Sequence, residues 1–450
     1  MNVALFTDTY FPQINGVGTS VHTLATELEK LGHNVYIFTP SDPKADKNEN
    51  NVIRMPSMPF LLLRNFRVGI AYPPLALKKI AGLKLDIVHT QTEFSLGMFG
   101  KVLSKAFHIP MIHTYHTMYE DYVHYIVNGA LVTPAMAKEF SKLFCNSANA
   151  VVAPTEKVKH ILLEYGVKKP IHIIPTGIDI KLFRKSNYTP EEILELKKEI
   201  GLDPSNPVVL FVGRIAKEKS IDVIIHAMPK LLEQLPDAKL VIVGDGPKKS
   251  ELEKLTDELQ ISENVLFLGA KPWKEIGKYY QLGDVFVSAS ITETQGLTFA
   301  EAMASGVTVV AKKDESLEGL VQDEQTGILF EEDEELSEKL YDILTDTQKR
   351  KQLSEASLQT IESLSVEAFA KNVESLYQDV LNYPEKYNFH VRNPYSPFTI
   401  GKKAVKELRG ISSNIVKKGK YVVNTPKRII TIFHNENNNT ENDEQQEENT

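Results

Sequence analysis

The stretch Val208-Val-Leu-Phe-Val-Gly-Arg-Ile-Ala-Lys-Glu-Lys-Ser220 contains the unit from which most of the chain is built. Val208–Val212 is an apolar, β-branched run that predicts a buried strand, and Gly213 predicts a turn directly after it. Similar runs recur along the chain, and many of them are separated by segments with helical spacing. This alternation predicts βαβ units around a parallel sheet.

The predicted strands form two sets, one on each side of a mostly polar stretch with three prolines, Phe183–Pro207. The first set is Val3–Phe6, Val35–Phe38, Asp86–His89, Met111–Thr114, Val151–Ala153 and His172–Ile174. The second set is Val208–Val212, Leu240–Val243, Val265–Leu268, Val285–Ser288 and Val307–Ala311. We therefore expect an α/β protein with two facing, doubly wound, Rossmann-like domains. Ligands should bind in the cleft, at the carboxyl ends of the strands.

The composition changes near the C-terminus. Between Lys402 and Arg428 there are nine Lys or Arg residues and one acid, Glu407, with apolar residues between them. Residues 435–450 contain six acids and no apolar side chain, which predicts disorder. The predicted division is an N-terminal Rossmann-like domain (1–190), a linker (191–206), a C-terminal Rossmann-like domain (207–365), a closing helix (366–390), a basic amphipathic tail (391–434) and the acidic end (435–450).

The overall composition is that of a globular protein. The chain has 450 residues, 42% apolar and 24% charged, which fits two or three domains. Its one cysteine, Cys145, cannot form an internal disulfide, which favours a reducing compartment. No signal peptide and no apolar run of membrane-spanning length is evident. We expect a cytoplasmic protein, or one attached to a membrane face without crossing it.

The segment Glu293-Thr-Gln-Gly-Leu-Thr-Phe-Ala-Glu301 carries the clearest chemical signal. A helix predicted over 297–305 begins beside a glycine, and a helix N-terminus offers free N–H groups and partial positive charge to a phosphate. Carboxylates on either side accept hydrogen bonds from sugar hydroxyls. An isolated pair of this kind is also compatible with a solvated helix cap. Together with the rest of the chain it predicts a sugar-nucleotide site.

Two further turns carry candidate ligand-binding residues. Arg214 and Lys219 follow a predicted strand and can converge on one diphosphate, although a solvated basic turn fits their spacing equally well. Gly16 and Gly18 follow the first strand, can take positive φ and would let a ligand approach the backbone. The third glycine of the dinucleotide fingerprint is missing, and no acid ends the second strand, which disfavours a nicotinamide enzyme.

Two histidines, His113 and His116, follow a strand of the first set and are expected to point toward the cleft, where a histidine can exchange protons with a ligand. A metal site is disfavoured, because the only acids near them are Glu120 and Asp121 and the chain has no Asp-x-Asp pair. We expect no bound metal or cofactor, with the basic pair and the helix terminus meeting the charge of a diphosphate.

These motifs occur in order with Asp8-Thr-Tyr-Phe-Pro12 and Ile174-Pro-Thr-Gly-Ile-Asp179. The combination resembles the retaining glycosyltransferases of family four, which have the GT-B fold, over about residues 1–385. Within that family, the segments that begin at His113 and Thr292 are similar to those of the bacterial 1,2-diacylglycerol 3-glucosyltransferases. Enzymes of that group make the glycolipid anchor of lipoteichoic acid.

The resemblance implies roles for individual residues. Arg214 and Lys219 would bind the donor diphosphate, Glu301 the ribose hydroxyls, and Glu293 the transferred sugar. His116 would contact that sugar and, with Glu293, serve catalysis. The remaining donor-binding positions are Gln295, Gly296 and Leu297, through their backbone N–H groups, and Gly16 and Gly18, in a loop that closes over the diphosphate. The chain departs from many members at Thr176, where they carry Asn.

The implied reaction moves glucose from UDP-glucose to 1,2-diacylglycerol with retention, giving 3-O-α-glucosyl-diacylglycerol. Alternatives are another UDP-hexose (galactosyl or N-acetylglucosaminyl transfer), a glycosylated lipid or another acceptor, a sugar-nucleotide epimerase, or an inactive nucleotide-binding protein recruited to membranes. The oligomeric state is not predicted.

The lipid acceptor that the resemblance implies would lie in an anionic membrane, so we expect a cytoplasmic protein bound peripherally to the inner face of the cell membrane. Two basic, apolar stretches are candidates: Met58–Arg67, followed by Lys78, Lys79 and Lys84, and the tail Lys402–Arg428. Each Lys or Arg near an anionic surface contributes about 1 kcal/mol. The tail has few aromatic residues that could stack on bases, so a nucleic-acid partner is disfavoured.

Overall fold

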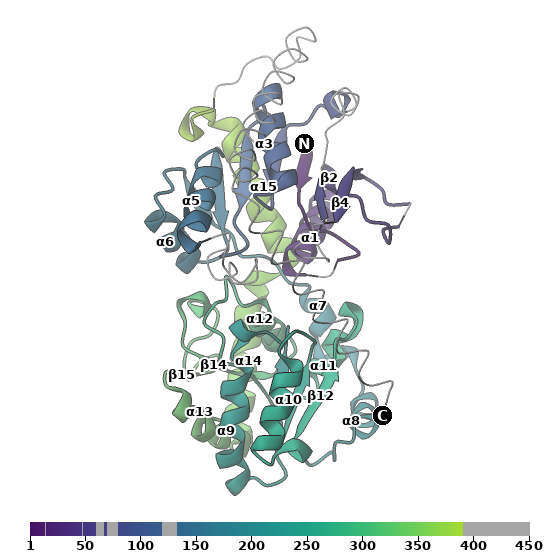
Figure 1. Cartoon of the computed structure of the whole chain (residues 1–450), viewed down its shortest axis with the longest axis vertical. Helices are drawn as coiled ribbons and strands as arrows, with labels where there is room; N and C mark the ends of the chain where they lie inside the picture. The colour runs from purple at the N-terminus through teal and green to yellow at the C-terminus, as the bar shows by residue number, and fades with distance from the viewer. Residues whose placement is uncertain (14, 47, 60–66, 70–79, 119–132, 390–450) are drawn as a thin grey trace, which may run out of the picture. The chain divides into compact units, whose positions relative to one another are not determined.

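The computed structural model describes residues 1–13, 15–46, 48–59, 67–69, 80–118 and 133–389 (Figure 1). Several predictions fall outside these ranges. They are the basic tail 391–434, the acidic end 435–450, residues 60–66 of the apolar stretch, Lys78 and Lys79, and the acids Glu120 and Asp121.

The first sheet has seven strands, all parallel, in the order β3-β2-β1-β6-β7-β8-β9. They are β1 (Asn2–Phe6), β2 (Asn34–Pro40), β3 (Val52–Met55), β6 (Ile87–Thr90), β7 (Met111–Thr114), β8 (Ala150–Ala153) and β9 (Ile171–Ile173). Strand order reverses between β1 and β6, where Val3 pairs with Ile87. In an open parallel sheet such a reversal is where a crevice for ligands forms.

The second sheet repeats this plan with six parallel strands in the order β12-β11-β10-β13-β14-β15. They are β10 (Val208–Val212), β11 (Lys239–Val243), β12 (Val265–Gly269), β13 (Val285–Ser288), β14 (Thr308–Lys312) and β15 (Ile328–Phe330). The reversal lies between β10 and β13. All predicted strands are present, so the doubly wound α/β prediction is confirmed. The short strands β3 and β15, and the antiparallel pair β4 (Ser57–Pro59) and β5 (Arg67–Gly69), were not predicted.

The helices around the first sheet are α1 (Gly16–Lys30), α3 (Ser95–Phe107), α5 (Pro134–Cys145) and α6 (Glu156–Glu164). Helix α1 begins at Gly16, earlier than helical spacing alone indicates, because the Asn15 side chain accepts a hydrogen bond from the Gly18 N–H at 2.9 Å and caps the helix. Gly16 and Gly18 are therefore residues of a helical first turn, and neither has positive φ. The expectation of a positive-φ glycine loop is wrong.

The helices of the second half are α7 (Ile180–Phe183), α8 (Pro190–Glu199), α9 (Ile221–Gln234), α10 (Lys249–Glu258), α11 (Ile276–Tyr280), α12 (Leu297–Ala304), α13 (Leu336–Thr345) and α14 (Thr347–Ile361). The segment predicted as a linker, 191–206, is mostly α8. Thr189 and Glu192 cap this helix reciprocally, and Leu196 and Leu202 are buried in the core beneath the second sheet. The segment thus packs on the second sheet, while the predicted domain boundaries themselves remain a prediction.

The last long helix, α15 (Val366–Asn382), returns to the first sheet. Phe369, Val373 and Tyr377 are buried in the same core as Val3 and Leu5, and Figure 1 shows this helix among those of the first sheet. The Tyr377 hydroxyl also lies 2.6 Å from His89 Nδ1. The predicted closing helix is therefore part of the core of the first domain.

The chain passes between the sheets twice, and the two crossing segments lie side by side. The Ile178 N–H donates to the Leu364 carbonyl at 2.9 Å. A Cβ on Gly177 would lie 2.7 Å from the Cβ of Phe369 and 2.8 Å from the Ser365 carbonyl oxygen. Because no larger residue fits this approach, Gly177 has a packing role.

Candidate active site

The turn after β10 and the loop after β13 are held together at the carboxyl edge of the second sheet. The hydroxyls of Ser290 and Thr292 donate to the Glu218 carbonyl at 3.1 and 3.2 Å. These bonds bring the turn that carries Arg214 and Lys219 against the loop that carries Glu293. Two motifs more than 70 residues apart therefore form one site.

Within this site Lys219 forms an ion pair with Glu293. Their side chains are 20% and 15% exposed, so each keeps a face toward solvent. Arg214 is 48% exposed and pairs with Glu218, which is 5% exposed. The structure thus joins the predicted diphosphate-binding lysine to the predicted sugar-binding acid, and it places Arg214 at the rim.

The turn Gly244-Asp-Gly-Pro247 supports the Arg214 turn. A Cβ on Gly244 would lie 1.8 Å from the Gly213 carbonyl oxygen, and a Cβ on Gly246 would lie 2.2 Å from that of Ile215. The Ile215 N–H donates to the Asp245 carbonyl at 2.9 Å. The glycines are needed because the two turns pack backbone against backbone.

Helix α12 begins where the sequence predicts, at Leu297. Gly296 is its N-cap with φ +72° and no side-chain cap, so no side chain of the capping residue competes for the first-turn N–H groups. A Cβ on Gly296 would lie 2.7 Å from Phe299 Cδ2. Gly16 of α1 faces this helix start, since a Cβ there would lie 4.0 Å from Leu297 Cδ1. Such a helix terminus suits an anion.

Glu301 lies one turn further along α12 in a different environment. It is 7% exposed, and the Tyr280 hydroxyl donates to its Oε2 at 2.7 Å. Burial raises the pKa of Glu301 to about 7, although the Tyr280 hydrogen bond acts in the opposite direction. The two predicted acids therefore differ: Glu293 is paired with a cation, whereas Glu301 is buried against a phenol.

The side chain of Gln295 makes contacts that the sequence did not predict. It is buried and bonds to the backbone of Thr176, while the role predicted for the Gln295 backbone N–H remains a prediction. Sequence reasoning did not anticipate a role for this side chain.

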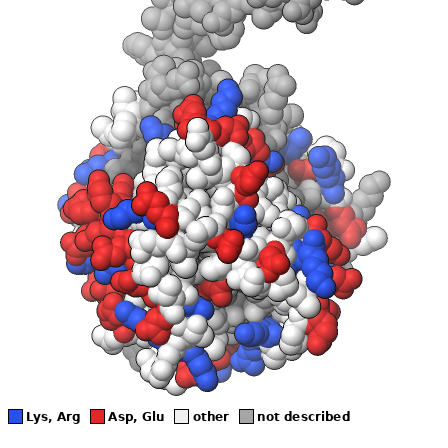
Figure 2. Space-filling view, turned by 90° about the horizontal axis from the view of Figure 1, so that it is seen from below, with Lys and Arg blue, Asp and Glu red and all other residues white. Residues whose placement is uncertain are grey.

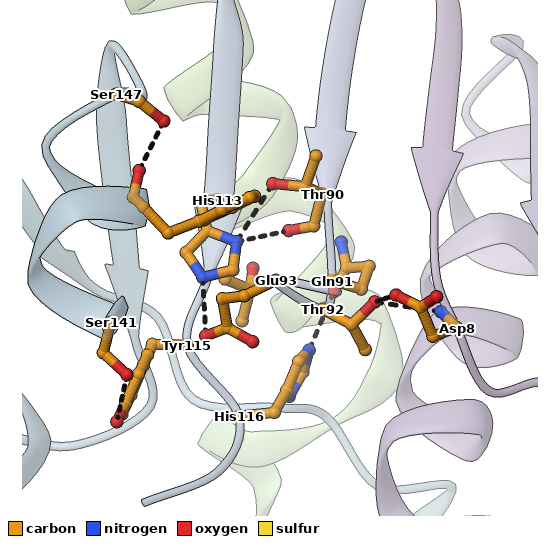
Figure 3. Close-up of polar contacts among 12 residues, drawn as sticks. Asp8, Thr90, Gln91, Thr92, Glu93, His113, Tyr115, His116, Ser141 and Ser147 are labelled. Atoms are coloured by element: carbon orange, nitrogen blue, oxygen red, sulfur yellow. Dashed lines mark hydrogen bonds and ion pairs between the residues drawn. The ribbon is translucent and has the colours of Figure 1, made fainter. Parts of the chain in front are cut away.

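In the first sheet, His116 follows β7 and lies near Gln91, which follows β6 (Figure 3). His116 Nε2 is 2.8 Å from Gln91 Oε1. Burial, and then the nearby His113, lower the pKa of His116 to about 3. His116 is therefore a neutral imidazole at physiological pH, suited to hydrogen bonding rather than to charge pairing.

His113 does not point into a cleft, and that prediction is wrong. It is part of β7 and fully buried, with Nε2 at 3.1 Å from Glu93 Oε1 and Nδ1 at 3.0 Å from the Thr90 hydroxyl (Figure 3). These partners make it a core histidine that connects two strands.

Asp8 was not singled out, although it lies at the reversal of the first sheet. Its carboxylate accepts hydrogen bonds from the Ser95 hydroxyl, the Thr92 hydroxyl at 2.6 Å and the Leu96 N–H at 3.0 Å, and it caps α3. Burial raises the pKa of Asp8. Because this cap comes from almost 90 residues away, no local capping pattern reveals it.

Over the described ranges, no group of three or more His, Cys, Asp or Glu side chains is placed to hold a metal ion. None of the described helices is long and apolar enough to cross a membrane. The expectation that the chain binds no metal remains a prediction.

Comparison with known proteins identifies the family. Residues 14–182 match "Glycosyltransferase Family 4", and residues 192–360 match "Glycosyl transferases group 1". The alpha-monoglucosyldiacylglycerol synthase of Streptococcus pneumoniae is 39% identical over 383 residues, which are 85% of this chain and 86% of that protein. The chain belongs to glycosyltransferase family four.

A second relative in this family is the alpha-monoglucosyldiacylglycerol synthase of Acholeplasma laidlawii, 37% identical over 86% of this chain and 99% of its own length. Among solved structures, Anabaena HepE in complex with UDP and glucose superimposes with a TM-score of 0.69 at 18% identity, over 84% of this chain and 100% of HepE. That likeness confirms the GT-B fold. This member of family four is thus a hexosyltransferase, which removes the nicotinamide-enzyme and epimerase alternatives.

Proposed function

We propose that this glycosyltransferase moves glucose from UDP-glucose to 1,2-diacylglycerol with retention, giving 3-O-α-glucosyl-diacylglycerol. The observation that carries the proposal is the meeting of Lys219, Glu293 and the start of α12 in one site, in a chain whose relatives are named for this product. A product of this kind would serve as a lipid anchor for lipoteichoic acid.

The site offers separate groups for each part of the donor. Buried Glu301 would take the ribose hydroxyls, and Lys219, with Arg214 at the rim, would take the diphosphate. Glu293 would grip hexose hydroxyls, and the N–H groups at the start of α12 would face the β-phosphate. No metal ion is required, because the cationic groups and the helix terminus supply positive charge.

Transfer creates negative charge on the departing phosphate, and fixed positive groups lower its energy. In the proposed step the acceptor oxygen bonds to the anomeric carbon on the face from which UDP leaves. The bond between that carbon and the β-phosphate oxygen breaks, and the acceptor proton passes to the departing phosphate. His116, as a neutral imidazole, would orient the sugar by hydrogen bonding.

An apolar surface of the first domain supports a lipid acceptor. Met136, Phe140 and Leu143 are exposed at helical spacing on α5. Exposed Phe94 stacks on Phe140, with ring centroids 6.0 Å apart. Phe94 follows the loop that carries Gln91, the partner of His116, so apolar side chains lie near the proposed reaction centre.

Peripheral attachment to an anionic membrane on the cytoplasmic side is part of the proposal. Figure 2 shows the molecule from below, at the end formed by the second sheet and its helices. Acidic and basic side chains are interspersed on this face, so positive charge is not concentrated there. We assign attachment to the first domain, which exposes the apolar side chains of α5, and to the basic tail, Lys402–Arg428.

The test is incubation of the purified protein with radiolabelled UDP-glucose, UDP-galactose or UDP-N-acetylglucosamine and diacylglycerol in mixed micelles. We expect label in a lipid product from UDP-glucose, with an α-anomeric proton signal by NMR. Label from another hexose only, a β-linked product, or no labelled lipid would refute the proposal.

A further inference from the structure

The loop formed by residues 290–296, called the Glu293 loop below, is attached on two sides. One side is the turn after β10, where Glu218 accepts two hydroxyl hydrogen bonds and Lys219 pairs with Glu293. This side contains the groups proposed to meet the diphosphate. A donor that engages Lys219 competes for the Lys219–Glu293 contact, so this ion pair alone does not hold the Glu293 carboxylate in place during binding.

The other side consists of residues from the first half of the chain. The Thr155 hydroxyl donates to the Thr294 carbonyl at 2.9 Å, and Lys157 Nζ donates to the Ile291 carbonyl at 2.8 Å. Lys157 is itself held by both carboxylate oxygens of Asp314 at 2.8 Å. These contacts fix carbonyl groups of the loop without using any residue proposed to touch the donor.

The most specific contact on this side is made by the Gln295 amide. Its Oε1 accepts from the Thr176 N–H at 2.7 Å, and its Nε2 donates to the Thr176 carbonyl at 2.8 Å. Both residues are 6% exposed. Because one backbone unit offers a donor and an acceptor, the orientation of the amide is fixed, and an ionised carboxylate of the same size would satisfy only the donor.

Thr176 is a firm anchor for this contact. It immediately precedes Gly177 and Ile178, which pack against the returning segment at Leu364 and Ser365. Gln295 lies between Glu293 and Gly296. Gly296 has a φ of +72°, and as a glycine it has no side chain that restricts rotation of the backbone. The Gln295 side chain therefore restrains the point at which the loop would otherwise rotate.

We propose that Gln295 is a positioning residue, whose side-chain amide fixes the Glu293 loop against Thr176 so that the Glu293 carboxylate meets the donor hexose. The inference rests on the proposed function and deepens it. It assigns to the Gln295 side chain a task separate from phosphate binding. Misplacement of a reacting group by about 1 Å can cost on the order of a hundredfold in rate.

The first test compares Gln295→Met, which keeps the length of the side chain and removes both bonds, with Asn264→Asp. Asn264 also donates to two backbone carbonyls, of Pro236 and Ala238 at 3.1 and 3.0 Å, but at the amino end of the second sheet. We expect Gln295→Met to lower kcat with UDP-glucose by on the order of a hundredfold and UDP affinity much less. Asn264→Asp should lower the Tm and leave kcat unchanged.

Calorimetry without acceptor separates this inference from the proposed function. Wild type should bind UDP-glucose and UDP with different affinities, and this difference should vanish in Gln295→Met and persist in Asn264→Asp. If the wild-type protein makes no glucosyl lipid, the proposed function is refuted. The calorimetric comparison still tests the positioning role of Gln295 in that case. An unchanged difference in Gln295→Met, or equal losses of kcat and UDP affinity, overturns the inference.

Gln295→Glu provides a second, independent readout. The new carboxylate still accepts from the Thr176 N–H but faces the Thr176 carbonyl, whereas the protonated acid can donate to it. Activity relative to wild type should therefore recover as pH falls. A ratio that does not change with pH contradicts the positioning role.

Discussion

Glu293 and Glu301 are identical side chains eight positions apart, and their surroundings give them different properties. Glu293 is paired with Lys219 at a partly open site, whereas Glu301 is buried beside Tyr280. Sequence reasoning identified both acids and Lys219 from the motif. It could not find Asp8 or Gln91, because their partners come from other loops. It also placed His113 toward the cleft together with His116, because burial depends on the fold.

The raised pKa of Glu301 makes stability depend on pH. Its ordinary pKa is 4.5 and its pKa in the folded protein is about 7, so between these values the folded protein holds a proton that the unfolded chain has lost. The contribution of Glu301 is fully present below pH 4.5 and is lost as pH rises through about 7. Relative to Glu301→Gln, wild type should lose on the order of 3 kcal/mol of unfolding free energy across this window.

Urea unfolding of both proteins at several pH values measures this difference. UDP affinity supplies a second readout, since an ionised carboxylate accepts hydrogen bonds from ribose hydroxyls more strongly than a protonated one does. The ratio of wild-type affinity to that of Glu301→Gln should rise as pH passes through about 7. A stability difference that is constant with pH would show that Glu301 is ionised throughout.

Lys219 tests the charge stabilisation of the transition state. Lys219→Ala should lower kcat/KM by on the order of a hundredfold, because a fixed cation near the departing phosphate is lost. Lys217→Ala is the matched control: Lys217 lies in the same turn and is exposed. Steady-state kinetics with UDP-glucose decide the question, and equal activity of the two variants would remove Lys219 from the mechanism.

Helices and strands of the two sheets were predictable because apolar runs and helical spacing are local signals. The start of α1 was not predictable. The Asn15 cap extends this helix across Gly16 and Gly18, which spacing alone assigns to a loop. The strands β3 and β15, four and three residues long, were not predicted. Periodicity over so few residues is a weak signal.

The Asn15 cap predicts a stability effect at the level of the element. Asn15→Ala should lower the unfolding free energy by about 1 kcal/mol, whereas Asn15→Ser keeps a capping oxygen and should have a smaller effect. Urea denaturation of both variants compares them directly. Equal losses in the two variants would mean that the hydrogen bond to the Gly18 N–H does not stabilise α1.

For the whole molecule, the sequence predicted two doubly wound units but not which sheet α15 and α8 pack against. The amphipathic face of α15 was evident, yet an apolar face does not name its partner, and in the structure this partner is the first sheet. The polar stretch between the strand sets similarly contains α8, because a few buried leucines are enough to pack it on the second sheet.

Membrane attachment is the prediction that belongs to this scale. A chain that ends at Asn388 keeps both sheets and α15 but lacks the nine basic residues between Lys402 and Arg428. In flotation with anionic vesicles it should bind more weakly than the full chain, and added salt should weaken the full chain most. If the full chain and the shortened chain float equally, the tail does not contribute and the first domain alone binds the membrane.

The most direct measurement for the central claim is a crystal structure of the enzyme with UDP-glucose. The account predicts the ribose at Glu301, the diphosphate between Lys219 and the start of α12, and the hexose at Glu293, without a bridging metal ion. A nucleotide bound away from these three side chains would contradict it.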